Sequence, residues 1–163
     1  MPSPFVCLIC GSRSDLPTLQ EGAALLADLG VHHEVRVISA HRAPELLDHY
    51  IADASARGAR VFVCAAGLAA HLAGAVAART PWPVIGVPMP GGVADGLDAL
   101  LSTVQMPRGV PVASVAVGGA VNAALLAAQI LSTSDEALAA RIVAFRTAQT
   151  QKILDDETNR GAP

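Results

Sequence analysis

The sequence predicts an α/β domain in which helices cover both faces of a doubly wound, parallel, five-stranded sheet. Strand-like and helix-like patterns alternate along the 163 residues, as they do in α/β folds. Several strand-like segments are nearly continuous apolar runs, which is typical of strands buried on both faces. The chain is 52% hydrophobic but only 3% aromatic, so we expect a core of Ala, Val, Leu and Ile with closely packed helices.

The strands are expected where short apolar or β-branched runs stand between turn residues. They are predicted at residues 5–11, 33–38, 60–66, 84–88 and 112–117. Because helix-like segments separate them, right-handed crossovers should join parallel neighbours. The strand order 2-1-3-4-5 of a flavodoxin-like fold is the natural arrangement of five such strands.

The helices are predicted at residues 15–29, 43–57, 69–79, 95–104, 120–132 and 134–157. We expect residues 1–163 to form a single domain, with its core in about 5–132. The long C-terminal helix, about 134–157, should begin with a capping box formed by Thr133 and Glu136. It is longer than a small sheet needs, so it either lies across its own domain or extends onto a neighbouring subunit.

Two long apolar stretches, 61–78 and 109–134, are long enough to cross a membrane. The second changes from a β-branched run to an Ala- and Leu-rich run at Gly118 and Gly119, which indicates a strand, a turn and a helix instead. Residues 1–4 do not have the shape of a signal peptide, so we expect a cytoplasmic protein that contacts no membrane. The formal net charge of −3 and the lack of a basic run argue against nucleic-acid binding.

The three cysteines, Cys7, Cys10 and Cys64, are expected to be small buried apolar residues. Cys7 and Cys10 form a C-x-x-C pattern, which can indicate redox chemistry. They lie in a predicted strand, however, where an offset of three sends the side chains to opposite faces. We therefore expect neither a disulfide nor a shared metal, and no other residues have the spacing of a metal site.

The loop after the first strand, residues 11–15, suits a phosphate. Ser12 and Ser14 offer hydroxyl groups, and the following helix offers unpaired N–H groups at its positive end. Asp15 repels a phosphate but accepts hydrogen bonds from sugar hydroxyls. The alternative is that Ser14 or Asp15 only caps the helix.

The loop after the second strand carries Ser39, Ala40, His41 and Arg42. Arg42 can hold a phosphate through two parallel hydrogen bonds, and a histidine such as His41 can both donate and accept a proton. The loop after the third strand is built of small residues, which let a ligand approach the backbone. It leads to His71, either a ligand contact or a packed structural histidine, and residues 88–92 are a candidate wall or lid.

Six motifs in the same order closely resemble the PurE family, the N5-carboxyaminoimidazole ribonucleotide mutases of purine biosynthesis. The resemblance covers about residues 6–151. The motifs are Gly11-Ser12-x-Ser14-Asp15, Ser39-Ala40-His41-Arg42, Ala69-Ala70-His71-Leu72, Gly86-Val87-Pro88, the run 104–112 and the run 122–131.

The resemblance implies an isomerase that converts N5-carboxyaminoimidazole ribonucleotide to 4-carboxyaminoimidazole ribonucleotide without a metal or cofactor. It implies that His41 is the general acid and base, that Asp15 holds the ribose, and that the phosphate lies with Ser12, Ser14 and Arg42. The other candidate substrate contacts are Ser39, Ala40, Gly67, His71 and Leu72. The family is typically octameric, with C-terminal helices packed between subunits.

The implied reaction is loss and recapture of carbon dioxide. Protonation of the carbamate nitrogen releases carbon dioxide, the enamine carbon C4 captures it, and a base removes the C4 proton. Confinement and orientation would be the protein's main work, with carbon dioxide held near Ala66, Gly67 and residues 71–72. The chain departs from the family at Leu68, usually glycine, at Ala73, usually proline, and in residues 90–95.

Two alternatives remain open. The related carboxylase uses free carbon dioxide and aminoimidazole ribonucleotide, but residues 39–42 and 70–72 look more like the mutase branch. A non-enzymatic flavodoxin-like binding module is the other. Flavin binding usually needs aromatic partners, and besides three Phe the chain offers only Trp82 and Tyr50, which favours the enzyme.

Overall fold

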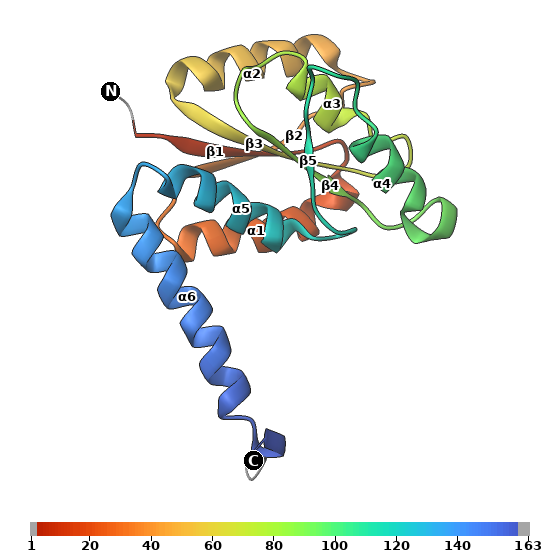
Figure 1. Cartoon of the computed structure of the whole chain (residues 1–163). Coiled ribbons are helices and arrows are strands. Elements are labelled where there is room, and N and C mark those ends of the chain that lie inside the picture. The colour runs from red at the N-terminus through yellow and green to blue at the C-terminus, as the bar shows by residue number, and fades with distance from the viewer. Residues whose placement is uncertain (1–2, 160–163) are drawn as a thin grey trace.

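Five parallel strands form one sheet in the order β2-β1-β3-β4-β5, as predicted. The computed structural model describes residues 3–159 (Figure 1). The strands are β1 (Phe5–Cys10), β2 (His33–Val37), β3 (Ala59–Ala66), β4 (Val84–Pro88) and β5 (Ala113–Ser114). β1 lies between β2 and β3 and pairs with both.

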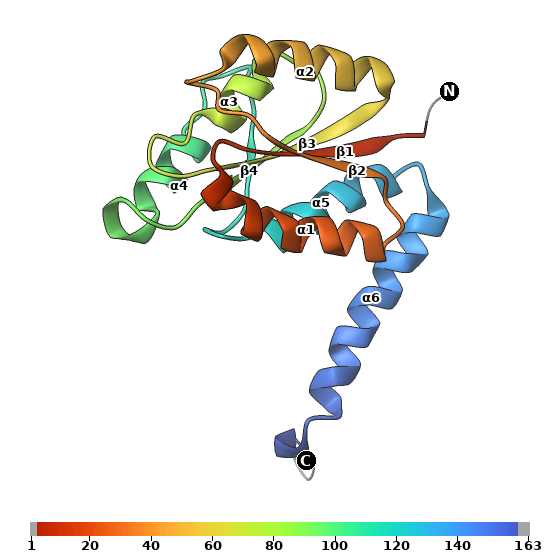
Figure 2. The same ribbon diagram turned by 180° about the vertical axis from the view of Figure 1, so that it is seen from behind.

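Helices cover both faces of the sheet. They are α1 (Leu16–Asp28), α2 (Pro44–Arg57), α3 (Leu72–Ala77), α4 (Leu97–Val104), α5 (Ala120–Ser132) and α6 (Glu136–Leu154), with 3₁₀ turns η1 (Arg13–Asp15), η2 (Val93–Asp95) and η3 (Glu157–Asn159). α1 and α5 lie on one face, and α2 and α3 on the other (Figures 1 and 2). The doubly wound, flavodoxin-like class is therefore confirmed.

The side chains of β1 alternate between two cores. Val6, Leu8 and Cys10 pack with α1 and α5, whereas Cys7 and Ile9 pack with α2 and α3. The prediction that the two thiols point to opposite faces is confirmed, and all three cysteines are buried and free. Burial raises the pKa of the Cys7 and Cys10 thiols to about 11, which leaves them protonated and unreactive at neutral pH.

The small residues of the core allow α1 and α5 to approach closely. A Cβ atom at Gly22 of α1 would come within 2.7 Å of the carbonyl oxygen of Ala120, the first residue of α5. Five alanines of α5 are fully buried at this contact and around it: Ala120, Ala123, Ala124, Ala127 and Ala128. Close backbone packing thus replaces the aromatic rings that the sequence lacks.

The fifth strand is much shorter than predicted. Only Ala113 and Ser114 pair regularly with β4, although residues 112–117 were expected to be extended. β4 ends at Pro88, which has no N–H to continue a ladder. Two isolated hydrogen bonds hold the following chain in place, from Val115 N to Gly86 O (3.2 Å) and from Gly118 N to Pro88 O (2.8 Å).

Two helices begin later than predicted. α3 begins at Leu72 and not at residue 69, because Leu68 has a φ of 55° and residues 69–71 belong to the loop. α4 begins at Leu97 and not at residue 95, because Gly96 has a φ of 109°. In both cases the first residues of the predicted helix belong to a loop at the carboxyl end of the sheet.

The predicted capping box of Thr133 and Glu136 is wrong. Thr133 continues the helical conformation of α5, and its hydroxyl donates to the carbonyl oxygen of Ile130 (2.7 Å). Asp135 is the extended residue before α6, and its carboxylate accepts from Leu138 N (2.9 Å). α5 must end before α6 can begin. The N-cap of α6 is therefore Asp135, two residues after Thr133.

Only the first half of α6 packs against the domain. Leu138 and Ile142 are buried, Phe145 packs partly against the same core, and Arg141 Nε donates to Leu29 O (2.7 Å). The second half projects away from the sheet and its helices (Figure 1). α6 therefore does not lie across its own domain.

No helix within residues 3–159 combines the length and the apolar character that crossing a membrane requires. The apolar stretch 109–134 contains β5, a turn and α5, which confirms its interpretation as a strand, a glycine turn and a helix.

The two candidate caps can be separated by mutation. Asp135→Ala should lower the free energy of unfolding by about 1 kcal/mol, because an N–H of the first turn of α6 loses its acceptor. Thr133→Ala should change it by less than about 0.5 kcal/mol, since its hydroxyl is exposed. Urea unfolding followed by circular dichroism measures both, and an equal loss in the two variants would contradict the assignment.

Candidate active site

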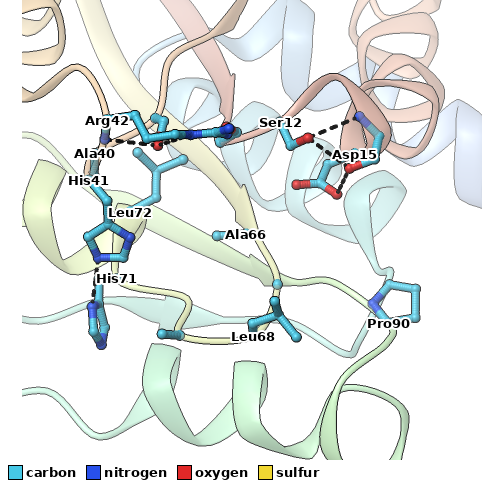
Figure 3. Close-up of a pocket in the computed structure, with 15 residues that line it drawn as sticks. Ser12, Asp15, Ala40, His41, Arg42, Ala66, Leu68, His71, Leu72 and Pro90 are labelled. Carbon is cyan, nitrogen blue, oxygen red and sulfur yellow. Dashed lines mark hydrogen bonds between the residues drawn. The ribbon is translucent and has the colours of Figure 1, made fainter.

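A pocket of about 560 Å³ opens at the carboxyl ends of β1, β2 and β3 (Figure 3). This is the edge where open α/β sheets bind ligands, and the volume suits a nucleotide-sized molecule. Its lining comes from the end of β3, the loops that follow these three strands and the start of α3, with one residue from the loop after β4. The lining residues are Gly11, Ser12, Ser14, Asp15, Ser39, Ala40, His41, Arg42, Ala66, Gly67, Leu68, Ala69, His71, Leu72 and Pro90.

Hydrogen bonds within the first loop hold its polar side chains together. Ser12 has extended backbone, and its Oγ accepts from Ser14 N (3.3 Å) at the start of η1. The Ser14 hydroxyl lies 2.9 Å from Ser12 Oγ and 3.1 Å from Asp15 Oδ1. Asp15 precedes α1 without a side-chain bond to its N–H groups, and the Ser14 hydroxyl contacts only Ser12 and Asp15, so the alternative that one of the two side chains caps this helix is not supported.

Arg42 joins the second loop to the first. Its backbone N–H and its Nε lie 3.2 and 3.3 Å from Ser39 Oγ, and its Nη2 donates to the carbonyl oxygen of Gly11 (3.0 Å). Pro44 follows as the first residue of α2, where its fixed φ and missing N–H are tolerated. The exposed guanidinium is thus held beside Ser12 and still has donors free for an anion.

His41 and His71 form a hydrogen-bonded pair on the opposite side of the pocket. His41 Nε2 lies 2.9 Å from His71 Nδ1, and the rings meet edge to face with centroids 5.0 Å apart. The Nδ1 of His41 is turned toward the pocket (Figure 3). Both rings are exposed, so His71 is not a packed core residue and belongs to the site.

The third wall is apolar. Ala66 and Gly67 are half-buried at the end of β3, and Leu72 is buried. Leu68 has a φ of 55°, a conformation that costs a leucine about 1 to 3 kcal/mol. Pro90, from the loop after β4, closes this side (Figure 3).

The charges of the pocket are divided between its ends. Arg42 and the serine hydroxyls lie at one end with Asp15, the only acidic side chain among the lining residues, and the histidine pair lies at the other. Within residues 3–159, no three His, Cys, Asp or Glu side chains are grouped as a metal would require. The arrangement can bind an anion at one end and transfer a proton at the other.

All ten residues chosen from the sequence line this one pocket: Ser12, Ser14, Asp15, Ser39, Ala40, His41, Arg42, Gly67, His71 and Leu72. Their individual roles stay predictions. Sequence reasoning did not foresee the contact between His41 and His71. It noted Leu68 only as a departure from the family in the third wall and did not choose it as a site residue. The only signal for Leu68 was its position in the motif, where a glycine is usual.

The family model described as AIR carboxylase matches residues 5–152. The N5-carboxyaminoimidazole ribonucleotide mutase of Mycobacterium tuberculosis (strain ATCC 25618 / H37Rv) is 56% identical over 143 residues, which are 88% of this chain and 82% of that protein. The phosphoribosylaminoimidazole carboxylase of Saccharomyces cerevisiae is 48% identical over 154 residues, 94% of this chain but 27% of that protein.

A solved structure agrees with both. The crystal structure of Treponema denticola PurE superposes with a TM-score of 0.88 at 29% sequence identity, covering 98% of this chain and 100% of that one. The family model, the relatives and the shared fold lead to one statement: this chain belongs to the AIR carboxylase family, the family of PurE.

Proposed function

We propose that this chain is an N5-carboxyaminoimidazole ribonucleotide mutase of purine biosynthesis that acts in the cytoplasm. The observation that carries the proposal is the single pocket in which an anion-binding end and a histidine pair face each other. The 56% identity to a mutase over 82% of that protein's length supports it. The carboxylase relative is matched over only 27% of its length, so its activity is less informative.

The ribonucleotide would bind with its phosphate at Ser12, Ser14 and Arg42. The positive guanidinium and the hydroxyl groups are donors suited to phosphate oxygens, and the N–H groups at the start of η1 and α1 add to them. Asp15 lies beside this end, where its carboxylate can accept from the ribose hydroxyls. The imidazole base then extends toward His41 and the apolar third wall.

The hydrogen bond between the histidines would determine which nitrogen of His41 exchanges a proton with the substrate. With His41 Nε2–H donating to His71 Nδ1, the other nitrogen, Nδ1, faces the pocket and is the one that exchanges protons (Figure 3). When His41 loses a proton from Nδ1, the ring remains in the neutral Nε2–H tautomer and can take a proton back. One residue thus serves as the acid and then as the base.

The steps balance without any other reactant. His41 gives a proton to N5 of the carbamate, the N–C bond breaks, and its electron pair stays on nitrogen as carbon dioxide leaves. The enamine carbon C4 attacks carbon dioxide, forming the new C–C bond. His41 then removes the C4 proton, which restores both the aromatic ring and its own starting state.

Recapture requires that carbon dioxide stays near C4. Carbon dioxide is apolar and small, and the wall formed by Ala66, Gly67 and Leu72 offers it no competing hydrogen-bond donors from side chains. Holding both fragments in one place converts a bimolecular recombination into an effectively unimolecular step. The protein's contribution is therefore confinement in addition to proton transfer.

The AIR carboxylase activity is the second candidate, and a two-substrate assay separates it from the first. Supplied with N5-carboxyaminoimidazole ribonucleotide, the protein should form the C4-carboxylated product rapidly, since the substrate carries its own carboxyl group. Supplied with aminoimidazole ribonucleotide and bicarbonate at physiological concentration, it should turn over far more slowly. Product is followed by its ultraviolet absorbance. Efficient turnover only in the second mixture would make the chain a carboxylase.

His41→Asn should lower kcat by roughly 100- to 10,000-fold, because the variant lacks the group that moves the proton. Binding of the ribonucleotide, measured by calorimetry, should stay within about threefold, since the phosphate and ribose contacts remain. His49→Asn is the matched control: His49 is exposed on α2 and lies outside the pocket lining. Near-normal turnover by a folded His41→Asn protein would remove His41 from the mechanism.

We also propose that the chain assembles as a homo-oligomer, an octamer as in the family it resembles. Two apolar surfaces support this. α4 exposes Leu97, Leu101 and Val104 by 45%, 48% and 48%, and these residues repeat at helical spacing on one face. The projecting half of α6 ends in Ile153 and Leu154, which are 66% and 64% exposed.

The oligomer can be tested at the end of α6. Ile153→Asp should reduce the mass measured by light scattering, because a charge on an apolar contact costs more than the contact provides. The fold of the subunit should survive, since Ile153 lies beyond the part of α6 that packs on the domain. Leu46→Asp on α2, where the leucine is 55% exposed, is the control. An unchanged mass for Ile153→Asp would exclude this contact.

A further inference from the structure

Leu68 stands out because its backbone conformation is unfavourable and its side chain contributes little to the core. Only three non-glycine residues within residues 3–159 have a positive φ: Leu68 (55°), Ala94 (46°) and Asp95 (51°). The Leu68 side chain is 61% exposed. Leu68 is largely exposed and has left-handed backbone, which is unfavourable for leucine. Stability of the fold therefore does not explain why this position is a leucine.

Leu68 rests on the loop after β4. A Cβ atom at Gly92 would come within 2.8 Å of Leu68 Cδ2, so the leucine side chain lies directly against the Gly92 backbone. Gly92 itself has a φ of 65°, and Asp95 accepts from Gly91 N (2.9 Å) within the same loop. All three unfavourable residues therefore belong to two segments that touch each other.

Both segments line the candidate active site. Leu68 and Pro90 both line the part of the pocket that lies away from Arg42 (Figure 3). Leu68 directly follows Ala66 and Gly67, which we assign to the apolar wall that faces the base. Unfavourable backbone that persists at a ligand site is evidence for a role in that site.

We propose that Leu68, supported by Gly92, is the apolar cover over the base and that its side chain determines how often released carbon dioxide escapes before C4 captures it. The inference rests on the proposed mutase activity. Bound ribonucleotide fills the polar end of the pocket, so the open space beside the base is where an apolar fragment leaves. An isobutyl group there narrows that exit and excludes water.

Escape has its own balanced reaction. After His41 has protonated N5 and the N–C bond has broken, loss of carbon dioxide leaves aminoimidazole ribonucleotide in the pocket. His41 is then neutral and must take a proton from water before the next cycle. The two outcomes of one bound substrate are therefore the C4-carboxylated product and aminoimidazole ribonucleotide plus carbon dioxide, and their ratio is measurable.

The test uses the full-length protein in excess over N5-carboxyaminoimidazole ribonucleotide labelled with ¹³C in its carboxyl group. Labelled product and labelled carbon dioxide are quantified, and the loss without enzyme is subtracted. Leu68→Ala and Leu68→Gly should raise the escaped fraction by roughly three- to tenfold, because most of the apolar cover is removed. Ribonucleotide affinity should stay within about threefold, since the phosphate contacts are untouched.

Ala94→Gly is the matched control. It relieves the same kind of backbone strain in the contacting segment, but Ala94 does not line the pocket. Leu68→Gly also relieves strain, so its melting temperature should be no lower than that of the unsubstituted protein. Instability therefore cannot account for a larger escaped fraction of carbon dioxide in this variant. Leu68→Ala keeps the strain and loses only the side chain beyond Cβ.

Each result decides the proposal. An escaped fraction of carbon dioxide that rises in both Leu68 variants but not in Ala94→Gly supports the proposal. An escaped fraction equal to that of the unsubstituted protein in both Leu68 variants overturns it, and so does an equal leak in Ala94→Gly, which would assign the effect to loop mobility. If the unsubstituted protein forms no C4-carboxylated product at all, the mutase activity itself is wrong, and that outcome is distinct from the others.

Discussion

The parallel pairing of β1 with both β2 and β3 is the constraint on which the site depends. Cys10, the last residue of β1, is aligned with Val37 of β2 and with Ala65 of β3. The three strands therefore end at the same level, and the loops that follow them leave the sheet side by side. Because helices cover both faces of the sheet, this edge is where their polar side chains can meet a ligand.

Strand pairing only brings the three loops near one another, and hydrogen bonds between the loops then fix the positions of their polar side chains. Arg42 reaches the Gly11 carbonyl, which sets the distance between the two loops that would hold the phosphate. The hydrogen bond between His41 Nε2 and His71 Nδ1 connects the second loop to the third and leaves Nδ1 of His41 facing the pocket (Figure 3). In the proposed function anion binding and proton transfer would thus be separated in space, and a bound phosphate would not compete with the carbamate for the histidine.

Much of this was predictable from sequence, because alternating strand and helix patterns place the loops and topology gathers them. Ser12, Asp15, His41 and Arg42 were found in this way. The contact between His41 and His71 spans 30 residues and leaves no local pattern. β5 was misjudged because Pro88, on the neighbouring strand, limits the ladder. Thr133 and Asp135 are both good caps, and only the end of α5 decides between them.

The proposed chemistry also requires that water is excluded from the pocket. A single subunit excludes it only in part. His41, Arg42, His71 and Leu68 are all exposed, whereas recapture of carbon dioxide is efficient only where the fragments cannot diffuse apart. In the proposed mutase the substrate would help to complete the site: its phosphate and ribose would fill the polar end, and its base would lie against the apolar side that includes Leu68. Under that proposal binding and confinement would be one event, and the energy of phosphate recognition would serve to hold carbon dioxide in place.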